Sequence, residues 1–386
     1  MRILHVIGWL DFADGGPPIV TTHLAAAQAD LGHDVTVAYY SSPVADQRTD
    51  AQLKSLPHWE KVKVHRLPPC SRLERLTGRS AGRALAQLVA SVDVVHLHNV
   101  WEGILIRAAA EARRMHKPYL VIINGMLHPW SLAQSRWKKR IALLLSHHRM
   151  LDHAAMIHVL NEDEKQAILP LGIRAPSIVI PNGVMLEEIE PLPPRGEFLG
   201  RRPELNGRRF VLFLARLHYK KGLDYSADAF AILAPRLADV DLVVAGPDGG
   251  ERENFQRRIA AAGLSGRVHL VGPIYGREKF SALVDADCFV LPSRQEGFSV
   301  AALEAMAAST PVILSQECNF PEAAVAGEIV PLNAPAVAAA LERVLTNPNR
   351  RALGQGGRAL VEARYTWKHI AGLTISAYEQ AIKSAR

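Results

Sequence analysis

Short apolar runs alternate with longer segments of helical periodicity along most of the chain. The first half contains such runs at Ile3–Ile7, Val35–Tyr39, Val92–Leu97, Tyr119–Ile123 and Met156–Val159. The second half contains them at Phe210–Leu214, Leu242–Ala245, Val268–Val271, Cys288–Leu291 and Val312–Leu314. Continuous apolar strands separated by helices are typical of parallel sheets that are covered on both faces. The pattern therefore predicts an α/β protein with two doubly wound parallel sheets.

A polar segment divides the two sets of strands. Glu190–Gly207 is rich in proline, glycine and arginine, which is typical of a linker. We therefore expect an N-terminal domain over residues 1–190 and a C-terminal domain over residues 191–366. Trp367–Ile382 has helical periodicity, and we expect the final helix, within residues 367–386, to pack back on the N-terminal domain.

The composition is that of a globular protein that favours anionic partners. Of the 386 residues, 48% are hydrophobic and 22% are charged, and the net charge is +7. The cysteines Cys70, Cys288 and Cys318 are odd in number and far apart, so we expect idle thiols in a reducing cytoplasm. The apolar N-terminus predicts a buried strand and not a signal peptide, because no small-residue cleavage site follows it. No apolar stretch reaches the roughly 18–20 residues that span a bilayer.

In an open parallel sheet, ligands bind at the carboxyl ends of the strands, so the loops there are the candidate sites. The loop Gly8–Gly16 follows the first strand and precedes a helix expected over Pro17–Leu31. Gly15 and Gly16 would let backbone N–H groups approach an anion, and the helix N-terminus adds partial positive charge. The loop is not GxGxxG, and a simple strand–helix turn explains it equally well.

Two loops of the second half carry charged side chains. In ARLHYKKG, Arg216 and Lys221 follow a buried strand, where two cations suit a diphosphate, although basic residues are common on loops. In EGFSVAALEA, Glu296 lies in a loop and Glu304 in the following helix, which Ser299 is expected to cap. Carboxylates accept hydrogen bonds from pairs of sugar hydroxyls, and N–H groups at a helix start can hold phosphate. The alternative is a pair of solvated glutamates on a surface helix.

The order of the motifs resembles the retaining glycosyltransferases of family 4, whose GT-B fold has two Rossmann-like domains facing a cleft. The second half contains ARLHYKKG, VVAGPDG, VHLVGPI and EGFSVAALEA. The first half contains DVVHLHN at Asp93–Asn99, GMLHPW at Gly125–Trp130 and PNGV at Pro181–Val184. Glu296 and Glu304 match the family hallmark of two glutamates separated by seven residues. GMLHPW is similar to a subgroup that builds bacterial surface polysaccharides.

The resemblance implies a role for each matching position. Arg216 and Lys221 would bind the donor diphosphate and neutralise the leaving group, and Glu296 would hold hydroxyls of the transferred sugar as the third catalytic residue. Glu304 would bind the ribose hydroxyls. The remaining donor-binding positions would be Gly15, Gly16, Gly272, Pro273, Ile274, Gly297, Phe298 and Ser299. Of these, Gly16 would approach the diphosphate across the cleft, and Gly272–Ile274 would line the base pocket.

One position departs from the family pattern near the reacting sugar. Family members commonly have a histidine before the glycine of the GMLxPW-like stretch, and here Asn124 precedes Gly125. An amide can donate a hydrogen bond but cannot titrate like imidazole, which counts against a general acid or base there and could signal a different sugar or reduced activity. His98 is either a residue facing the acceptor or a hydrogen-bonded structural histidine, and His96 is unassigned.

Other charged features are expected to be structural. Asp285 and Asp287 form a DxD sequence, which we interpret as capping or solvated residues. We predict no metal and no cofactor, because GT-B enzymes generally use protein cations. The segments Arg72–Arg83 and Ser135–Arg149 are basic with interleaved apolar residues. Each is either a solvated helix with a buried stripe or a peripheral contact with an anionic membrane.

The resemblance implies a transferase that moves a hexose from a UDP- or GDP-linked donor to a saccharide or lipid-linked saccharide in polysaccharide biosynthesis. We expect it in the cytoplasm, with the inner membrane face as a candidate contact, and nucleic acid is not an expected partner. Two alternatives stay open: a GT-B sugar-nucleotide epimerase and a non-catalytic nucleotide-sugar-binding protein. The missing dinucleotide fingerprint argues against a dehydrogenase.

Overall fold

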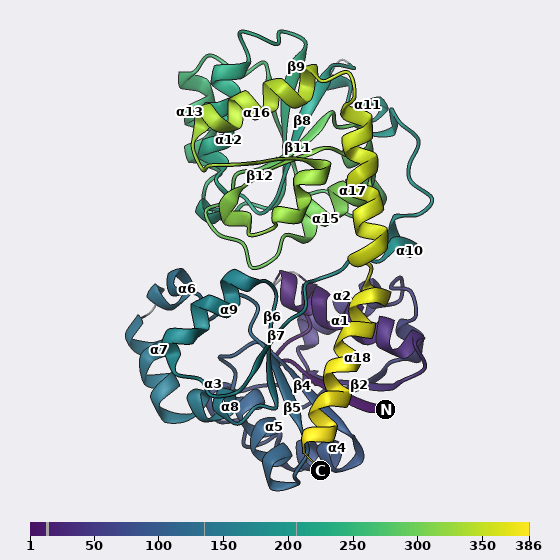
Figure 1. Cartoon of the computed structure of the whole chain (residues 1–386), viewed down its shortest axis with the longest axis vertical. Helices are drawn as coiled ribbons and strands as arrows, with labels where there is room; N and C mark the ends of the chain where they lie inside the picture. Colours follow the sequence, from purple (N-terminus) through teal and green to yellow (C-terminus); the bar gives the residue numbers. More distant parts are fainter. Residues whose placement is uncertain (13–14, 135, 206, 386) are drawn as a thin grey trace. The chain divides into compact units, whose positions relative to one another are not determined.

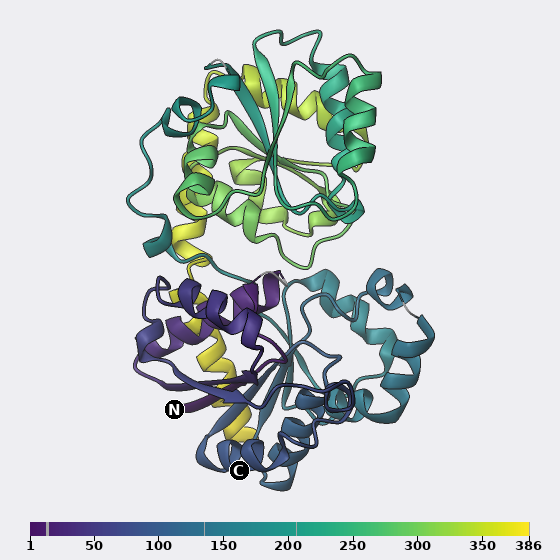
Figure 2. The same ribbon diagram turned by 180° about the vertical axis from the view of Figure 1, so that it is seen from behind.

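The computed structural model describes residues 1–12, 15–134, 136–205 and 207–385. The chain forms two compact units (Figures 1 and 2). Unit 1 comprises Met1–Asn182 and Trp367–Arg386, and unit 2 comprises Gly183–Thr366. Each unit is a parallel sheet with helices on both faces, so the predicted Rossmann-like architecture is confirmed for both.

The described residues of unit 1 form a seven-stranded sheet in the order β3-β2-β1-β4-β5-β6-β7, and all neighbouring strands are parallel. The strands are β1 (Arg2–Val6), β2 (Asp34–Tyr40), β3 (Lys63–Leu67), β4 (Val94–His98), β5 (Tyr119–Ile122), β6 (Met156–Val159) and β7 (Ser177–Val179). Every residue of β4 and β5 is buried, including His96 and His98 of β4, as is typical of central strands in a sheet that is covered on both faces.

The helices of unit 1 connect these strands and cover the sheet. They are α1 (Gly16–Asp30), α2 (Pro43–Leu53), α3 (Arg72–Thr77), α4 (Gly82–Ser91), α5 (Gly103–Arg114), α6 (Pro129–Ala133), α7 (Arg136–Ala142), α8 (His148–Asp152), α9 (Glu162–Ile168) and α18 (Trp367–Ser384). The last of these brings the end of the chain back to unit 1. Gln28 of α1 donates hydrogen bonds to the hydroxyls of Thr374 (2.9 Å) and Tyr378 (3.1 Å) on α18.

The described residues of unit 2 form a six-stranded parallel sheet in the order β10-β9-β8-β11-β12-β13. The strands are β8 (Arg209–Leu214), β9 (Val240–Ala245), β10 (Val268–Gly272), β11 (Cys288–Leu291), β12 (Val312–Ser315) and β13 (Gly327–Val330). The helices are α10 (Leu186–Ile189), α11 (Glu197–Gly200), α12 (Leu223–Leu233), α13 (Arg252–Ala261), α14 (Gly276–Asp285), α15 (Val300–Ala307), α16 (Ala334–Thr346) and α17 (Arg350–Arg364).

The segment interpreted as a linker is part of unit 2, so that interpretation was wrong. Within Glu190–Gly207, Phe198 is fully buried and Leu205 is 1% exposed in the core of this unit. The carboxylate of Asp285 accepts hydrogen bonds from the N–H groups of Phe198 (2.9 Å) and Leu199 (3.0 Å) and so caps α11. Asn206 lies outside the described residues.

The boundary between the units also precedes the predicted one. It lies between Asn182 and Gly183, eight residues before the expected end of the first domain at residue 190. The N–H of Val184 donates to the carbonyl of Tyr365 (2.8 Å), and Val184 also forms a parallel bridge with Thr366. This pairing ties the residues after Asn182 to the end of unit 2.

Candidate functional site

The loops after β8 and β11 are in very close contact at the carboxyl edge of the unit 2 sheet, where the two strands are neighbours. Gly222 has a φ of +67°, and a Cβ atom there would lie 1.7 Å from the carbonyl oxygen of Pro292. No side chain fits at this distance, so only glycine allows the approach. The contact brings the turn Tyr219–Lys221 against the residues that follow β11.

This approach places Lys221 directly on Glu296. The ammonium Nζ of Lys221 donates to Oε1 and Oε2 of Glu296 at 2.6 and 2.8 Å. The hydroxyl of Ser293 donates to Oε1 at 2.6 Å, and the N–H of Glu296 donates to the carbonyl of Glu317 at 3.1 Å. The Glu296 side chain is 8% exposed and that of Lys221 is 27% exposed. The pair is therefore held rigidly, with the cation on the more open side.

Arg294 fixes the turn that carries Lys221. Its guanidinium donates to both carboxylate oxygens of Asp224 (2.8 and 2.6 Å) and to the carbonyl of Tyr219 (2.8 Å). It also lies 3.8 Å from the ring centroid of Tyr219 and 4.6 Å from that of Tyr225. The N–H of Arg294 donates to the carbonyl of Lys220 at 2.7 Å. These contacts hold the backbone before and after Lys221 in one position.

Arg216 is exposed at the same edge, two residues after β8. The loop after β9 packs against it, because Gly246 has a φ of +143° and a Cβ there would lie 1.9 Å from the carbonyl oxygen of Ala215. The local field is positive: burial lowers the pKa of His218, and the charges of Lys220 and Arg216 lower it further. This edge therefore suits an anion.

Glu304 lies on α15, the helix that follows β11. Its Oε1 accepts a hydrogen bond from Nζ of Lys279 on α14 at 2.7 Å. Ser299 caps the helix as predicted, because its hydroxyl accepts from the N–H of Ala302 at 3.3 Å. Phe298 packs against Phe320, with ring centroids 4.9 Å apart, and follows Gly297 in the same loop. The loop and helix that carry both predicted glutamates are thus anchored in the core of unit 2.

The predicted base-pocket segment follows β10. Gly272 ends this strand at a register irregularity with a φ of +78°, and its carbonyl accepts from the N–H of Gly246 at 2.9 Å. Pro273 is exposed and Ile274 is 3% exposed. The segment lies at the same sheet edge as the loops after β8 and β9.

In unit 1, Gly15 and Gly16 begin α1. Gly15 is the N-cap with a φ of +105°, and a Cβ at Gly16 would meet none of the described atoms within 4 Å. Ala13 and Asp14, in the middle of the predicted loop, lie outside the described residues.

Asn124 and Gly125 form a constrained turn after β5. Both have positive φ values, +47° and +72°, and the amide of Asn124 donates to Oδ1 of Asn99 at 3.1 Å. The N–H of Gly125 donates to Oε1 of Glu164, whose Oε2 accepts from the N–H of Leu160 at 2.6 Å. Glu164 is 2% exposed, and burial raises its pKa to about 7. A buried carboxyl thus holds the backbone of this turn.

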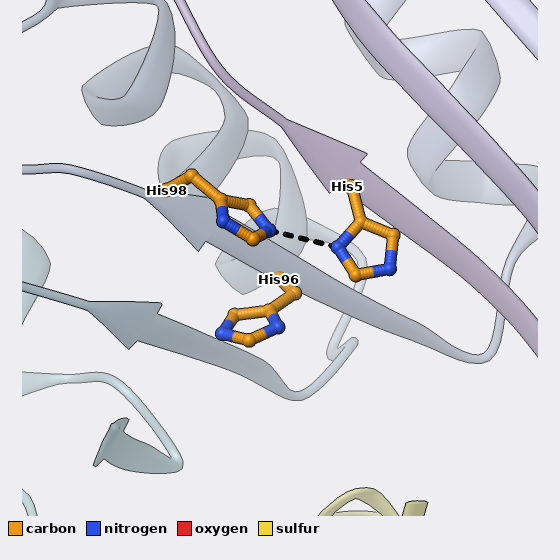
Figure 3. Close-up of side chains that lie close together, drawn as sticks. All are labelled: His5, His96 and His98. Carbon is orange, nitrogen blue, oxygen red and sulfur yellow. Dashed lines mark hydrogen bonds between the residues drawn. The ribbon is translucent and has the colours of Figure 1, made fainter. Parts of the chain in front are cut away.

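His98 belongs to a buried cluster with His5 and His96 (Figure 3). Nδ1 of His5 lies 2.8 Å from Nε2 of His98, and Nε2 of His5 lies 2.8 Å from Oε1 of Gln28. Since Gln28 uses its NH₂ for α18, its oxygen accepts from His5, and His5 in turn accepts from His98. This geometry favours a structural role for His98.

His96 continues the same network toward the final helix. The carbonyl of Ile180 accepts from Nε2 of His158 (2.7 Å), so Nδ1 of His158 accepts from Nε2 of His96 (3.4 Å). Nδ1 of His96 then accepts from the hydroxyl of Tyr378 at 2.7 Å. Burial lowers the pKa of His158 to about 4 and that of His96 well below its usual range, so the rings are neutral. Ligand nitrogens of His5, His96 and His98 lie within 4.8 Å of one another, but these hydrogen bonds already occupy most of them.

Two residues near the candidate positions were not found from the sequence. Lys279 binds Glu304, as described above. Glu102 begins the connection to α5 and lies against Gly8, where a Cβ would come within 3.0 Å of its Cγ. Burial raises the pKa of Glu102 to about 7, and its Oε2 has no hydrogen-bond partner among the described residues. Lone acidic or basic residues carry no sequence signal that distinguishes them from surface charges.

The two DxD residues were expected to cap a helix or to be solvated, and only Asp285 does so. Asp285 caps α11, as described for the fold. Asp287 is a buried residue that pairs with Arg350 at 2.9 Å, so it is not solvated. Both lie at the amino end of β11, the opposite end from Glu296.

The two basic segments include short helices with exposed apolar side chains. Leu73 and Leu76 on α3 are 68% and 73% exposed, and Trp137 and Ile141 on α7 are 74% and 55% exposed. Ser135, within the second segment, lies outside the described residues. None of the helices in the described ranges is long and apolar enough to cross a bilayer.

Comparison with known proteins assigns each unit to a family. Residues 15–183 match the model of the glycosyl transferase 4-like domain, and residues 197–359 match glycosyl transferases group 1. An MMP alpha-(1->4)-mannosyltransferase of Mycolicibacterium hassiacum is 26% identical, with 95% of each chain covered. The GDP-mannose:cellobiosyl-diphosphopolyprenol alpha-mannosyltransferase of Xanthomonas campestris is 27% identical over 100% of this chain and 98% of the relative.

Solved structures show the same fold at lower identity. HepE of Anabaena, in complex with UDP and glucose, has a TM-score of 0.77 at 18% identity and covers 98% of this chain and 100% of its own. Sucrose-phosphate synthase from Thermosynechococcus elongatus has a TM-score of 0.72 at 21% identity, with both chains fully covered. With a glycosyltransferase domain matched in each unit and full-length glycosyltransferase relatives, this chain is a GT-B glycosyltransferase and belongs to family 4.

Proposed function

We propose that this glycosyltransferase moves a hexose from a UDP- or GDP-linked donor to a saccharide or lipid-linked saccharide, with retention of the anomeric configuration. The observation that carries the proposal is the contact of Lys221 with both carboxylate oxygens of Glu296. A cation suited to a diphosphate and an acid suited to sugar hydroxyls lie side by side at the carboxyl edge of the sheet. The Xanthomonas relative is named for GDP-mannose, which supports a mannosyl donor as the first candidate.

In this proposal, donor binding replaces the contact between Lys221 and Glu296. The diphosphate takes the ammonium of Lys221 and the guanidinium of Arg216, and the N–H groups at the start of α15 add partial positive charge. Glu296 keeps its hydrogen bond from Ser293. It accepts hydrogen bonds from hydroxyls of the transferred sugar, which replace those from Lys221. These cations stabilise negative charge on the leaving diphosphate as the C1–O bond breaks, which is an electrostatic form of catalysis.

Retention is proposed to follow from reaction on one face of the sugar. The incoming hydroxyl forms the new C1–O bond on the face from which the diphosphate departs, and its proton passes to the departing phosphate oxygen. Glu296 keeps its hydrogen bond from Ser293 and its side chain is 8% exposed, which argues against a free carboxylate nucleophile. Asn124 cannot act as a general base, so a leaving group that accepts the proton suits this chain.

The proposal is tested by donor binding and turnover. A thermal-shift panel of GDP-mannose, UDP-glucose and ADP-glucose should give a rise in melting temperature with at least one donor. Lys221→Met should reduce the shift and abolish the release of nucleoside diphosphate. Glu328→Gln is the matched control, because Glu328 forms an ion pair with Arg343 elsewhere in unit 2 and its loss should change neither measurement.

Other outcomes would support the alternatives. Conversion of the donor to an isomeric nucleotide sugar without acceptor would identify an epimerase. Tight donor binding with no release of diphosphate, with or without acceptor, would identify a non-catalytic binding protein. Full turnover by Lys221→Met would reject the roles assigned here.

A peripheral membrane contact is proposed for α7. Exposed Trp137 and Ile141 alternate with exposed Arg136, Lys138 and Arg140, a combination suited to an anionic lipid surface. The protein should co-sediment with phosphatidylglycerol vesicles more than with phosphatidylcholine vesicles, and replacing Trp137 with alanine should weaken this binding. Equal sedimentation of the wild type and the Trp137→Ala variant with phosphatidylglycerol vesicles would reject the contact.

A further inference from the structure

The two predicted sugar-binding glutamates differ in how their oxygens are used. Both oxygens of Glu296 accept from Lys221, and Oε1 also accepts from Ser293. Among the described residues, Glu304 shares only Oε1, with Nζ of Lys279 at 2.7 Å, and its side chain is 17% exposed. A carboxylate has about four lone-pair sites, so Glu304 keeps acceptor capacity on Oε2 and on the second lone pair of Oε1.

Lys279 occupies a position that its helix alone would not favour. It is the fourth residue of α14 (Gly276–Asp285), in the first turn, where the helix dipole disfavours a cation. Its ammonium also lies 4.6 Å from the ring centroid of Phe280, a residue that is 5% exposed. The carboxylate of Glu304 offsets the unfavourable position, and Phe280 limits where the ammonium can lie.

We propose that Lys279 is a positioning residue for the nucleoside of the donor, acting through Glu304. By binding one oxygen from the side of α14, it fixes the carboxylate so that the remaining lone pairs accept from two adjacent hydroxyls of the ribose. This inference rests on the proposed function, in which Glu304 receives the ribose. It adds that recognition of a ribonucleotide depends on an ion pair between α14 and α15.

A positioning role has a different signature from direct contact with phosphate. If Lys279 acts through Glu304, its removal weakens binding of ribonucleotides and leaves binding of 2′,3′-dideoxyribonucleotides unchanged. If Lys279 touches the diphosphate, both classes weaken by the same factor. If the ion pair only stabilises the fold, neither affinity changes at a temperature where the variant is folded.

The test measures this discrimination by titration calorimetry. GDP, UDP and ADP are each compared with their 2′,3′-dideoxy counterparts. Hydrogen bonds to a charged acceptor give the wild type a preference for the ribose form of about tenfold or more. Lys279→Met keeps most of the unbranched side chain but removes the ammonium, and should reduce the preference to about one. Lys279→Arg, which can still bind Glu304, should restore most of it.

Arg277→Met is the matched control. Arg277 lies in the same first turn of α14 but pairs with Glu197 at 2.6 Å, so its loss should leave the preference unchanged. An unchanged preference in Lys279→Met, an equal loss for both nucleotide classes, or no preference in the wild type would overturn the inference alone. No binding of any nucleoside diphosphate by the wild type would overturn the proposed function with it.

Discussion

Replacing Gly222 with alanine should break the contact that places Lys221 on Glu296. A Cβ at this position would lie 1.7 Å from the carbonyl oxygen of Pro292, whereas real Cβ contacts are essentially never under 3.0 Å. The difference, 3.0 − 1.7, means that the loops after β8 and β11 must separate by about 1.3 Å. The two hydrogen bonds from Arg294 to the carbonyls of Lys220 and Tyr219 cross this contact, at 2.7 and 2.8 Å.

Gly207 is a matched control for the backbone conformation. It has the same φ of +67°, but a Cβ there would meet none of the described atoms within 4 Å. Gly207→Ala should therefore lower the free energy of unfolding only by the strain of the left-handed conformation, about 1–2 kcal/mol. Gly222→Ala should cost that amount plus about 1 kcal/mol for each lost hydrogen bond, or about 2 kcal/mol more than the control.

Unfolding in urea separates the units spectroscopically. All six tryptophans lie in unit 1, so their fluorescence follows that unit, while circular dichroism follows both. Gly222→Ala should lower the urea concentration at which the circular dichroism of unit 2 is lost and leave the midpoint seen by fluorescence unchanged. It should also abolish donor binding. Equal stabilities of Gly222→Ala and Gly207→Ala, with normal donor binding, would refute the reasoning.

Two further predictions concern buried polar groups of unit 1, followed by tryptophan fluorescence in urea. Tyr378→Phe removes the hydroxyl that donates to His96 and should cost about 2–4 kcal/mol, because a buried imidazole nitrogen and an amide lose their partner. Tyr39→Phe is the control, because the ring of Tyr39 is equally buried but its hydroxyl accepts from the half-exposed Arg66. It should lower the free energy of unfolding by about 1 kcal/mol or less. Equal losses in the two variants would contradict the hydrogen-bond network of Tyr378, His96 and Gln28. Glu164→Gln tests the carboxyl beneath Gly125. Its folded pKa of about 7 exceeds the unfolded value of 4.5, so its stabilising contribution is complete below pH 4.5 and is lost as pH rises through 7. The wild type should therefore lose up to about 3 kcal/mol relative to the variant between pH 5 and pH 8, and a constant difference would contradict the raised pKa.

The central strands could be predicted from the sequence, and of the edge strands among the described residues only β10 was predicted, as Val268–Val271. Strands such as β5 and β11 are buried along their whole length and appear as continuous apolar runs. β3, β7 and β13 were missed, and each lies at the edge of its sheet with mostly partly buried or exposed residues. An edge strand is covered less completely than a central one and needs fewer apolar residues. Its sequence of polar and apolar residues therefore resembles that of a loop.

The same limit applies to the candidate site. The glycines, cations and glutamates of the loops follow recognisable strands, so their place at the sheet edge could be predicted. Their partners could not, because Lys279 reaches Glu304 from a different helix and Tyr378 reaches His96 across 282 residues. Sequence spacing reports neighbours on one element, whereas these contacts depend on how elements pack.

The most direct test of the central claim compares a nucleoside diphosphate with its monophosphate. The claim is that Lys221 binds the diphosphate of the donor, so the wild type should bind GDP or UDP more tightly than the corresponding monophosphate, by about tenfold or more in calorimetry. Lys221→Met should lose most of this preference, and the part that remains should come from Arg216 and the start of α15. A diphosphate preference that survives unchanged in Lys221→Met would contradict the account.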